Sequence, residues 1–379
     1  MNKLLLKNLL LFISFFYSIN SVCQYQKLSS ITKISVLTCG AGGELYSIYG
    51  HTAIRIKDET LNLDVVYNYG NFDFATENFY AKFVKGDLKY FVAACYFNDF
   101  MAEYRETNRD VFEQVLKLND FQKQQFFDEL NTAIYSDERF YTYKFIDKNC
   151  TTMVLDKVNK VFGQNTVVKV KTSNESYRTV LYSYVKNHFW ENFGINIIFG
   201  TKVDNQASKL FLPDELMQNI KISKTKNIAI AEKTTVLNKK TSSTEYFSFW
   251  NSIFPYSIIL LLIAFFNKKG INIFYFSVLG LAGFFFSLVV LYSFHEEIYY
   301  NYNALLFNPS LLFLIYHILS KNNVWIKNLC YFNLACLVIY LVILINKAHL
   351  IMMFPMIFCS ATLFYKLILS NKKLLPSVK

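Results

Sequence analysis

The sequence lacks the short motifs that bind cofactors and metal ions. It has no Gly-rich phosphate loop and no Rossmann fingerprint, so nothing in it implies a nucleotide cofactor. Its seven cysteines contain no CxxC pair, so neither a zinc ribbon nor a thioredoxin motif is supported. It also shows no internal repeat at solenoid spacing. We therefore expect a protein without a cofactor or bound metal, whose chemistry depends on its own side chains.

Charge is also scarce, at 18% of the 379 residues, and it is unbalanced towards a net charge of +11. The lysines form no single stripe, which argues against a nucleic-acid partner. Many lie in short loops between apolar runs, where lysines are attracted to anionic lipid headgroups. Hydrophobic residues make up 53% of the chain and the mean hydropathy is +0.22, values too apolar for a soluble protein. The excess begins after Thr244, so the chain divides into a globular half and an apolar half.

The N-terminus has the order of a secretory signal peptide. Lys3 and Lys7 provide a positive start, an apolar stretch follows, and small or polar residues lead up to Cys23. We expect a signal peptide at 1–23, and an uncleaved segment would instead add a membrane anchor. In either case the following domain, residues 24–220, is expected outside the cytoplasm.

Five apolar runs in the second half are each near the ~20 residues that a membrane-spanning helix needs. They cover residues 247–266, 271–293, 303–319, 326–345 and 350–369. Lysines are concentrated in the loops 267–270 and 321–327, whereas the loop 295–300 carries two glutamates. Because basic loops stay in the cytoplasm, this alternation places the globular half on the outer side. We therefore expect a multi-pass protein of the bacterial inner membrane, with a transmembrane domain at 247–370 and a cytoplasmic tail at 371–379.

Local patterns in the globular half predict an α+β domain. Apolar alternation and helical spacing indicate strands at 31–38, 51–57, 63–69 and 140–146, and helices at 119–132 and 151–162. Residues 58–62 lie between two of the strands and predict an antiparallel hairpin. Residues 221–246, rich in Lys, Thr, Ser and Asn, predict a linker to the apolar half.

Cys150 lies where a strand or loop gives way to a predicted helix. A helix N-terminus carries free N–H groups and a partial positive charge, which lower the pKa of a thiol and favour the thiolate nucleophile. The same N–H groups could bind an oxyanion. Cys39 is the rival nucleophile, although it more readily packs in the core or forms a disulfide with Cys95 in an oxidising compartment.

A thiolate nucleophile needs a base, and His51 is the candidate. The other histidine of the globular half, His188, lies in an aromatic helical stretch, where a packing role is more natural. The predicted hairpin places His51 opposite one of the residues 68–70. Asn68 could then hold the imidazole, giving a Cys-His-Asn arrangement like that of papain-type enzymes. A lone Cys or His is more often a packed residue, so spacing alone is a weak basis for this site.

Four further residues are candidates for substrate contact. Arg55 and Arg139 could hold a phosphate headgroup, although solvated surface arginines are commoner. Tyr69 lies among the residues expected opposite His51. Asn303 lies at the mouth of the third predicted span, where contact with a lipid headgroup and plain interfacial solvation weigh about equally.

Several segments of the chain, in order, resemble one known family. They are YSIYGHTAIRI, VVYNYGNFDF, NFYAKFVKGDLKYFV, ERFYTYKFIDKNCTT, SYRTVL, NFGINIIFG and FLPDEL in the globular half, and YNYNALLFNP in the apolar half. They resemble the Lnb-type lipoprotein N-acyltransferases of Bacteroidetes. The resemblance covers nearly the whole chain after the signal peptide.

The resemblance implies a permuted papain-like domain, similar to NlpC/P60 and lecithin:retinol acyltransferase-like proteins, followed by an all-α membrane bundle of about five transmembrane helices. It matches the family's histidine to His51 and its cysteine to Cys150, whereas Asn68 rests on the hairpin argument alone. It also implies an acyltransferase that moves an acyl chain from a phospholipid to the N-terminal amine of a diacylglyceryl-cysteine lipoprotein. The expected partners are therefore a phospholipid donor, a diacylated lipoprotein acceptor and the membrane, with the catalytic domain in the periplasm.

Two other functions remain open at this point. A membrane-anchored cysteine peptidase or amidase acting on the cell wall fits the same dyad, although it has no clear need for five spans. A catalytically inactive domain that binds lipoproteins as a scaffold belongs to a different class of protein. Such a domain needs neither Cys150 nor His51.

Overall fold

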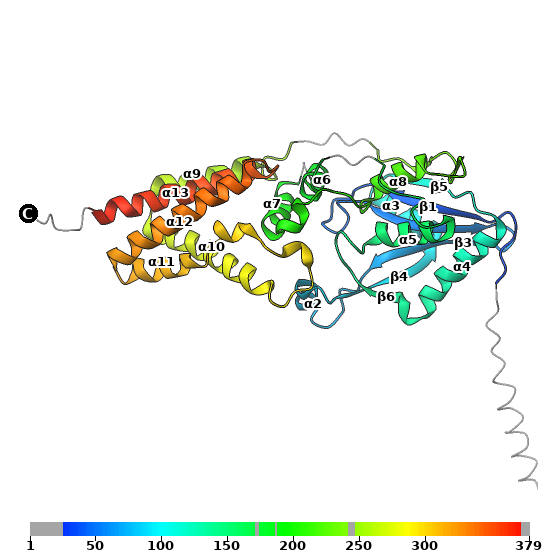
Figure 1. The fold of residues 1–379 in the computed structure, drawn as a ribbon, viewed down its shortest axis with the longest axis horizontal. Coiled ribbons are helices and arrows are strands. Elements are labelled where there is room, and N and C mark those ends of the chain that lie inside the picture. The colour runs from blue at the N-terminus through cyan, green and yellow to red at the C-terminus, as the bar shows by residue number, and fades with distance from the viewer. Residues whose placement is uncertain (1–25, 171–173, 186–187, 242–246, 373–379) are drawn as a thin grey trace, which may run out of the picture.

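The computed structural model describes residues 26–170, 174–185, 188–241 and 247–372. The predicted signal peptide, and the predicted tail beyond residue 372, lie outside the described residues. Figure 1 shows an elongated molecule, with a sheet and its helices at one end and a bundle of long helices at the other. The first part is a mixed α/β domain with an antiparallel sheet and the second is helical, as the two halves of the sequence predict.

The sheet of the first part has seven strands in the order β6-β4-β3-β2-β1-β5-β9, and neighbouring strands are antiparallel. Its strands are β1 (Lys33–Cys39), β2 (His51–Asp58), β3 (Leu63–Asn71), β4 (Lys89–Tyr96), β5 (Val111–Val115), β6 (Phe140–Thr142) and β9 (Thr235–Asn238). The short strands β7 (Lys224–Thr225) and β8 (Ile228–Ala229) pair with each other. The strand predicted at 140–146 is shorter than expected, because its pairing with β4 ends at Thr142.

The predicted hairpin is confirmed as β2 and β3. The carboxylate of Asp58 supports its turn by accepting a hydrogen bond from the Thr60 N–H at 3.0 Å. In the register of the hairpin, Ala53 lies opposite Asn68. Because side chains alternate along a strand, His51 shares the face of Ala53 and of Asn68 and lies two residues nearer the end of the sheet.

The helices predicted at 119–132 and 151–162 are also confirmed, as α4 (Asp120–Tyr135) and α5 (Cys150–Phe162). Each begins with a capping box, in which an asparagine side chain accepts a hydrogen bond from a free N–H of the first turn. The caps are Asn119 and Asn149. α5 ends at Gly163, whose φ of 108° suits a residue without a side chain.

Helices cover both faces of the sheet, and the alternation of β2 divides its residues between them. On one face, Ile54 and Ile56 belong to a core with Val154 of α5, which also includes residues of α4 and of α8 (Pro213–Ile222). On the other face, Ala53 packs in a smaller core with Phe100 of α3 (Phe97–Glu106). Burial of both faces explains why the strands of the central sheet are largely apolar.

The range 221–246, predicted as a linker, contains structure that the prediction missed. α8 continues to Ile222, and β9 joins the sheet as an edge strand beside β5. An edge strand tolerates polar side chains because much of it faces solvent, so composition alone could not separate it from a linker. The sheet domain therefore extends beyond residue 220.

The helical region contains α9 (Ile253–Phe266), α10 (Lys269–Val289), α11 (Ser310–Leu319), α12 (Asn323–Leu344) and α13 (Leu350–Lys372). Four stretches of the described residues are long and apolar enough to cross a membrane: Lys269–Val289, Glu296–Leu319, Asn323–Leu344 and Leu350–Ser370. α9 is apolar but has 14 residues, fewer than a span usually needs. Where the sequence predicts five spans, the structure therefore shows four candidate spans and one shorter apolar helix.

The sheet domain is joined to the bundle by α6 (Tyr177–Tyr184), α7 (Phe189–Ile198) and the short turns η2 (Thr201–Asp204), η3 (Glu296–Ile298) and η4 (Tyr302–Leu305). Phe189 belongs to the apolar core of the bundle. Arg178 is buried, donates to the Gly200 carbonyl at 2.8 Å and pairs with Asp204 at 2.6 Å. Lys347, from the loop before α13, pairs with the same Asp204 at 2.7 Å. Arg178 thus holds the segment around Asp204, and Asp204 connects this segment to the bundle through Lys347.

A second set of ion pairs ties the loop after α10 to the sheet domain. Lys202 pairs with Asp147 at 2.5 Å and with Glu296 at 2.8 Å. Lys144, six residues before Cys150, pairs with the same Glu296 at 2.5 Å. The segment that leads into α5 is therefore held at the end of the bundle.

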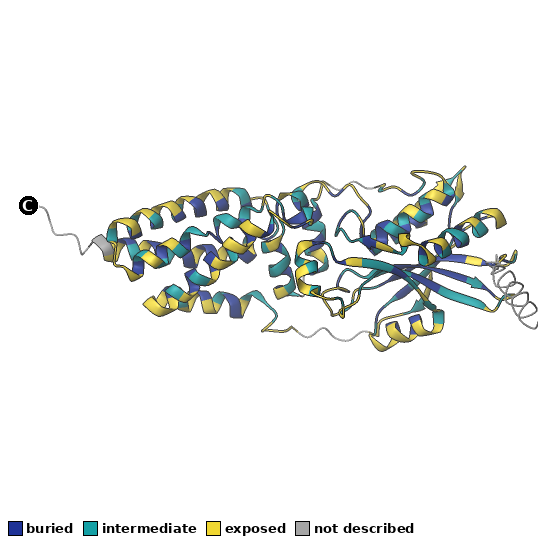
Figure 2. Cartoon of the chain, turned by 90° about the horizontal axis from the view of Figure 1, so that it is seen from below, coloured by how far each residue is buried: buried dark blue, intermediate teal, exposed yellow. Residues whose placement is uncertain are grey.

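α9 extends along the bundle despite its length. Before its start, the Trp250 carbonyl accepts a hydrogen bond from Nε1 of Trp190 in α7, at 2.9 Å. Near its end, the Ala264 carbonyl accepts one from Nζ of Lys366, near the C-terminal end of α13, at 2.7 Å. Figure 2 shows buried residues inside the bundle and exposed residues along its outside, and the exposed residues include Phe274. Apolar side chains on the outside of a bundle suit contact with lipid.

Candidate active site

Three elements meet at one end of the sheet and bring Cys150, His51 and Asn68 together. Cys150 is the first residue of α5, His51 is the first residue of β2, and Asn68 lies in β3. The hydroxyls of Thr52 and Thr151 are 3.1 Å apart in a buried contact between β2 and α5. Because each of these threonines directly follows a site residue, the contact holds the starts of the strand and the helix next to each other.

Asn149 fixes the start of α5. Its Oδ1 accepts hydrogen bonds from the N–H groups of Thr151 at 2.9 Å and Thr152 at 3.0 Å. Its Nδ2 donates to the carbonyls of Phe145 at 2.8 Å and Phe211 at 2.9 Å. The first residue of the helix is therefore anchored to two other segments. Two of the N–H groups expected to be free for an oxyanion are not free, because Asn149 accepts from both.

His51 connects the other two site residues. A side-chain hydrogen bond links its ring to Cys150. Its Nε2 lies 3.2 Å from Oδ1 of Asn68. Asn68 is held in turn, since its Nδ2 donates to Sγ of Cys95 at 3.4 Å. The structure thus brings together the thiol, imidazole and amide that the sequence analysis selected, in that order.

The electrostatics of the pair favour its ionised form. Burial alone would raise the pKa of Cys150, but the charge of His51 and hydrogen bonds from His51 and from the Thr52 N–H lower it below the ordinary thiol value. Burial alone would lower the pKa of His51, but the charge of Cys150 and hydrogen bonds to Cys150 and Asn68 raise it above the ordinary value. Opposite shifts of this kind are those of a thiolate–imidazolium pair. The site therefore favours a thiolate at Cys150 more than an isolated cysteine would.

Two glycines shape the backbone around His51. Gly50, directly before it, has a φ of 81°, and an added Cβ would lie 2.5 Å from the Cys39 carbonyl oxygen. Gly70 has a φ of 94°, and an added Cβ would lie 3.6 Å from Cβ of Cys150. Glycine is the residue that adopts such φ values without strain. Gly70 therefore leaves room beside the nucleophile.

The rival nucleophile Cys39 has the opposite environment. It is fully buried, and burial raises its pKa to about 12. A disulfide with Cys95 is absent, because both thiols are free. β1 and β4 are separated by two strands, which is roughly 14 Å at the usual strand spacing and too far for a disulfide.

The two predicted headgroup arginines have other partners. Arg55 is 7% exposed, pairs with Asp64 at 2.7 Å and with Glu113 at 3.1 Å, and stacks on the Phe97 ring. Two carboxylates therefore already balance its charge. Arg139 lies beside β6 with its guanidinium over the Phe91 and Phe140 rings, at 5.3 and 5.5 Å from their centroids. Neither arginine is brought to Cys150.

Tyr69 and Asn303 also have structural surroundings. Tyr69 is 1% exposed and belongs to the core under α5. Asn303 is fully buried between α7 and the bundle. Its Nδ2 donates to the Asn196 carbonyl at 2.9 Å, and its Oδ1 accepts from the Tyr340 hydroxyl at 2.6 Å. Its side-chain amide therefore forms hydrogen bonds within the protein and does not face lipid.

The other histidines near the domain lie outside the site. His188 precedes α7 and its Nδ1 lies 3.9 Å from Glu191, which agrees with the packing role expected of it. The ring of His295, after α10, lies 2.8 Å from the Phe83 carbonyl. Among the described residues, no group of three or more His, Cys, Asp or Glu is arranged to hold a metal ion.

Sequence analysis missed Asn149, Gly70 and the role of Tyr143. Asn149 had a readable signal, since an asparagine three residues before a threonine at a helix start is a capping pattern. Gly70 had none, because its closeness to Cys150 depends on how α5 packs on the sheet. Tyr143 had none either: it packs against the same core cluster as Cys150, and the charge of Cys150 is, after burial, among the causes that raise its pKa.

A mixed α/β domain with a cysteine–histidine pair is followed by helices long and apolar enough to cross a membrane, which is the architecture of a membrane protein with a globular domain outside the bilayer. Residues 23–183 match the family model of the Lnb N-terminal periplasmic domain. The match covers most of the sheet domain and shows that this part of the chain is similar to the periplasmic domain of the Lnb family. No match is found among curated proteins or among solved structures.

Proposed function

We propose that this protein is a lipoprotein N-acyltransferase of the bacterial inner membrane, with Cys150 as nucleophile and His51 as base. The observation that carries the proposal is the thiol–imidazole pair of opposite pKa shifts at the start of α5. The family model supports it through its periplasmic domain. The ion pairs before α5 support it as well, because Lys144 pairs with Glu296 on the bundle side and Asp147 is connected to the same Glu296 through Lys202. A nucleophile held close to a bilayer suits substrates that are themselves lipids.

In the first half-reaction, the Cys150 thiolate attacks the carbonyl carbon of a phospholipid ester. The carbon–oxygen bond of the ester breaks, and the His51 imidazolium gives its proton to the leaving alkoxide. The products are a lysophospholipid and an acyl-thioester on Cys150. The positive end of the α5 dipole favours the negative charge that develops near Cys150.

In the second half-reaction, the N-terminal amine of a diacylglyceryl-cysteine lipoprotein attacks the thioester. Neutral His51 accepts a proton from the amine as the new carbon–nitrogen bond forms. The carbon–sulfur bond breaks, which restores the thiolate and the imidazolium and leaves an amide on the lipoprotein. Asn68 orients the ring through both steps. No cofactor is required, because every proton moves between His51 and the substrates.

The fold that we propose for the sheet domain is a permuted papain-like one. The supporting features are a nucleophilic cysteine at a helix start, a histidine on a neighbouring strand of an antiparallel sheet, and the order of His51 before Cys150 in the chain. For the bundle we propose five crossings, because α9 extends along it between Trp190 and Lys366.

The proposed topology predicts where reporter fusions are active. Fusions after Asn62 and within 295–300 should behave as periplasmic. Fusions at Lys268 and after Lys373 should behave as cytoplasmic. A cytoplasmic result at Asn62 would overturn the orientation, whereas a periplasmic result at Lys268 would remove α9 as a span.

The function is tested by expressing the full chain in a strain that lacks its own lipoprotein N-acyltransferase. Mass spectrometry of lipoprotein N-termini should show an added amide-linked acyl chain with the wild type and none with Cys150→Ser, at equal protein levels. Unacylated lipoproteins with wild-type protein would contradict the proposal. Cleaved cell-wall peptides in the same cells would instead indicate the peptidase or amidase.

A further inference from the structure

Aromatic side chains form a row that leads away from the Cys150 site. Tyr143, which packs against the same core cluster as Cys150, stacks on Tyr90 with 4.5 Å between ring centroids. Tyr90 in turn contacts Phe72, at 5.4 Å. Tyr143 and Tyr90 are only partly buried, as is Cys150. The row therefore begins at the core cluster against which Cys150 also packs, and it leads away from that core.

The row continues into the loop after β3 and the helix that follows it, α2 (Phe79–Lys85). Phe72 contacts Phe74 at 4.9 Å and Phe79 at 6.0 Å. Phe79 stacks on Phe83 at 6.3 Å, and Phe83 contacts the ring of His295 at 6.1 Å. Each ring is thus within contact distance of the next from Tyr143 to α2.

The outer side of this segment is strongly apolar and uncovered. Phe74 is 65% exposed, Tyr80 is 79% exposed and Phe83 is 46% exposed, and α2 has no buried residue. We name residues 72–86 the aromatic lip. Exposed aromatic side chains gathered on one short element mark an interaction surface.

The position of the lip indicates what covers it. The Phe294 N–H donates to the Lys85 carbonyl at 2.7 Å, and the Ser293 hydroxyl donates to the Val84 carbonyl at 2.9 Å. Gly86 allows this approach, since an added Cβ would lie 3.1 Å from the His295 ring. These loop residues directly follow the candidate span Lys269–Val289, and Figure 1 shows α2 between the sheet and the bundle. The lip is therefore fixed where the bundle meets the outer surface of a bilayer.

The chemistry of the lip suits that surface. Aromatic side chains are enriched at the interface between a membrane and water, where their rings lie at the level of the headgroups. Lys82 and Lys85 both lie in the last turn of α2, so positive charge adjoins the rings, as it does in helices that bind anionic lipid. Lys85 pairs with Asp87 at 2.6 Å, and its Nζ lies 5.6 Å from the centroid of the Phe294 ring in the loop after α10.

We propose that the aromatic lip lies in the outer surface of the bilayer and that the acyl chain of a phospholipid passes along the aromatic row to Cys150. The membrane contact stands on its own evidence, whereas the identity of the lipid as acyl donor rests on the function proposed above. The row supplies an apolar path, so the chain avoids water between the bilayer and the thiolate.

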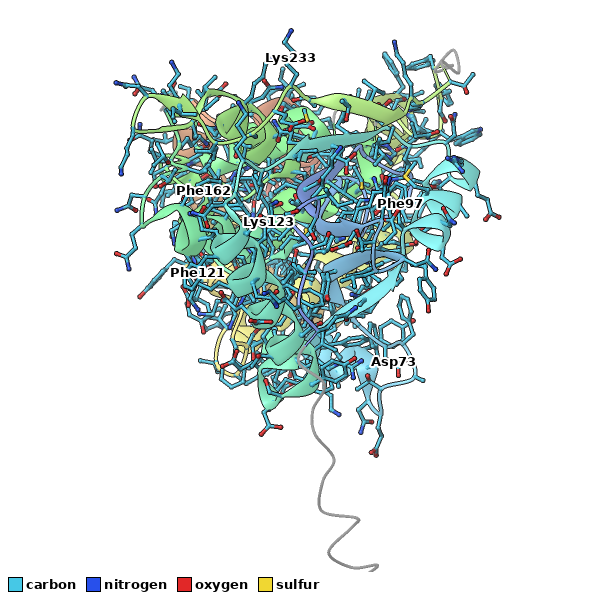
Figure 3. The ribbon with its side chains drawn as sticks, turned by 90° about the vertical axis from the view of Figure 1, so that its right-hand side faces the viewer. Asp73, Phe97, Phe121, Lys123, Phe162 and Lys233 are labelled. Atoms are coloured by element: carbon cyan, nitrogen blue, oxygen red, sulfur yellow. The ribbon has the colours of Figure 1, made fainter. Side chains whose placement is uncertain are left out.

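The membrane contact is tested with the full chain in vesicles whose phospholipids carry brominated acyl chains. Bromine quenches tryptophan emission, so the additional emission of Tyr80→Trp should be quenched. The matched control is Phe121→Trp, because Phe121 is 77% exposed and, in Figure 3, lies on the end of the domain that faces away from the bundle. Its additional emission should be unaffected. Equal emission losses at both positions, or none at position 80, would overturn the proposal.

The delivery of lipid is tested with the double variant Phe74→Ser/Tyr80→Ser. Acyl-thioester formation on Cys150 is measured with vesicle phospholipid and with a water-soluble p-nitrophenyl butyrate donor. The ratio of the two rates should fall about tenfold, because two exposed apolar contacts with lipid are removed, and Phe121→Ser should leave it unchanged. An unchanged ratio in the double variant would overturn the proposal.

The two proposals fail in different ways. If the wild type forms no thioester with either donor while Tyr80→Trp is still quenched, the acyltransferase function fails and the membrane contact stands. If thioester forms from both donors and Tyr80→Trp is not quenched, the acyltransferase function stands and the proposed membrane contact of the aromatic lip fails.

Discussion

Cys39, at the end of β1, and Cys150, at the start of α5, lie on two sides of His51. Cys39 is its partner across the strands, and Cys150 is hydrogen-bonded to its ring. Cys39 is sealed in a core, where a hydrogen bond with Tyr104 does not offset burial and its pKa rises to about 12. Cys150 is also desolvated, but the charge of His51 and the Thr52 N–H lower its pKa. His51 is among the causes that lower the pKa of Cys150, whereas the pKa of Cys39, its partner across the strands, is governed by burial. A position next to His51 in the sheet is therefore not enough to activate a thiol.

The largest effect should come from exchanging the two sulfurs for oxygen one at a time. Cys150→Ser should slow transfer by roughly 10⁴-fold or more, since a serine hydroxyl stays protonated beside His51. Cys39→Ser should keep most of the activity of its folded fraction. N-acylation of a lipoprotein in vesicles is the measurement, with protein level as the control. A folded, inactive Cys39→Ser together with an active Cys150→Ser would reverse the assignment.

A smaller effect should follow from removing the Asn68 amide, which orients the imidazole ring of His51. Asn68→Ala should reduce turnover about tenfold, because it removes the amide that orients His51 but leaves the base in place. Asn68→Asp should recover part of the loss, because a carboxylate oxygen can accept the same hydrogen bond. Initial rates with saturating acceptor measure both. Equal rates in Asn68→Ala and the wild type would show that the ring needs no third residue.

The smallest effect should come from the buried thiol itself. Cys39→Ala removes one sulfur from a filled core, which should lower the free energy of unfolding by about 1 kcal/mol and leave the rate of transfer per folded molecule unchanged. A thermal unfolding scan beside a rate measurement separates the two quantities. A loss of rate without a loss of stability would give Cys39 a role in the chemistry.

Much of the sheet domain was predictable because its signals are local. The hairpin of β2 and β3 follows from two alternating segments around a turn, and α5 follows from helical spacing between Asn149 and Gly163. The strand β9 was not predictable, because a four-residue polar edge strand is defined by its neighbour β5 rather than by its own pattern. α9 was predicted as a span from apolar length, but its helix covers only part of that run.

The distinction between local signals and contacts distant in sequence also applies to the site. Cys150 and His51 were selected because a helix start and a strand start can be read from sequence, and Asn68 followed from the hairpin register. Arg55 and Asn303 were considered as substrate contacts, but the structure gives each of them partners within the protein, some of which are distant in sequence. Glu113 lies 58 residues from Arg55, and Tyr340 lies 37 residues from Asn303. From sequence alone, a polar residue that forms an ion pair or a hydrogen bond between domains cannot be distinguished from a substrate-binding residue. The distinction requires the positions of its partners in the fold.

The central claim is that His51 holds Cys150 as a thiolate, and alkylation of Cys150 across pH tests it most directly. The full chain is treated with iodoacetamide at a series of pH values from about 5 to about 10, and mass spectrometry follows the label on Cys150. Because the pKa of Cys150 is lowered by His51, the wild type should react at a pH below that of an ordinary thiol, and His51→Ala should shift the rise in reactivity to higher pH. Cys39 should stay unlabelled throughout, since burial raises its pKa to about 12. An identical pH dependence of Cys150 in the wild type and in folded His51→Ala would contradict the account.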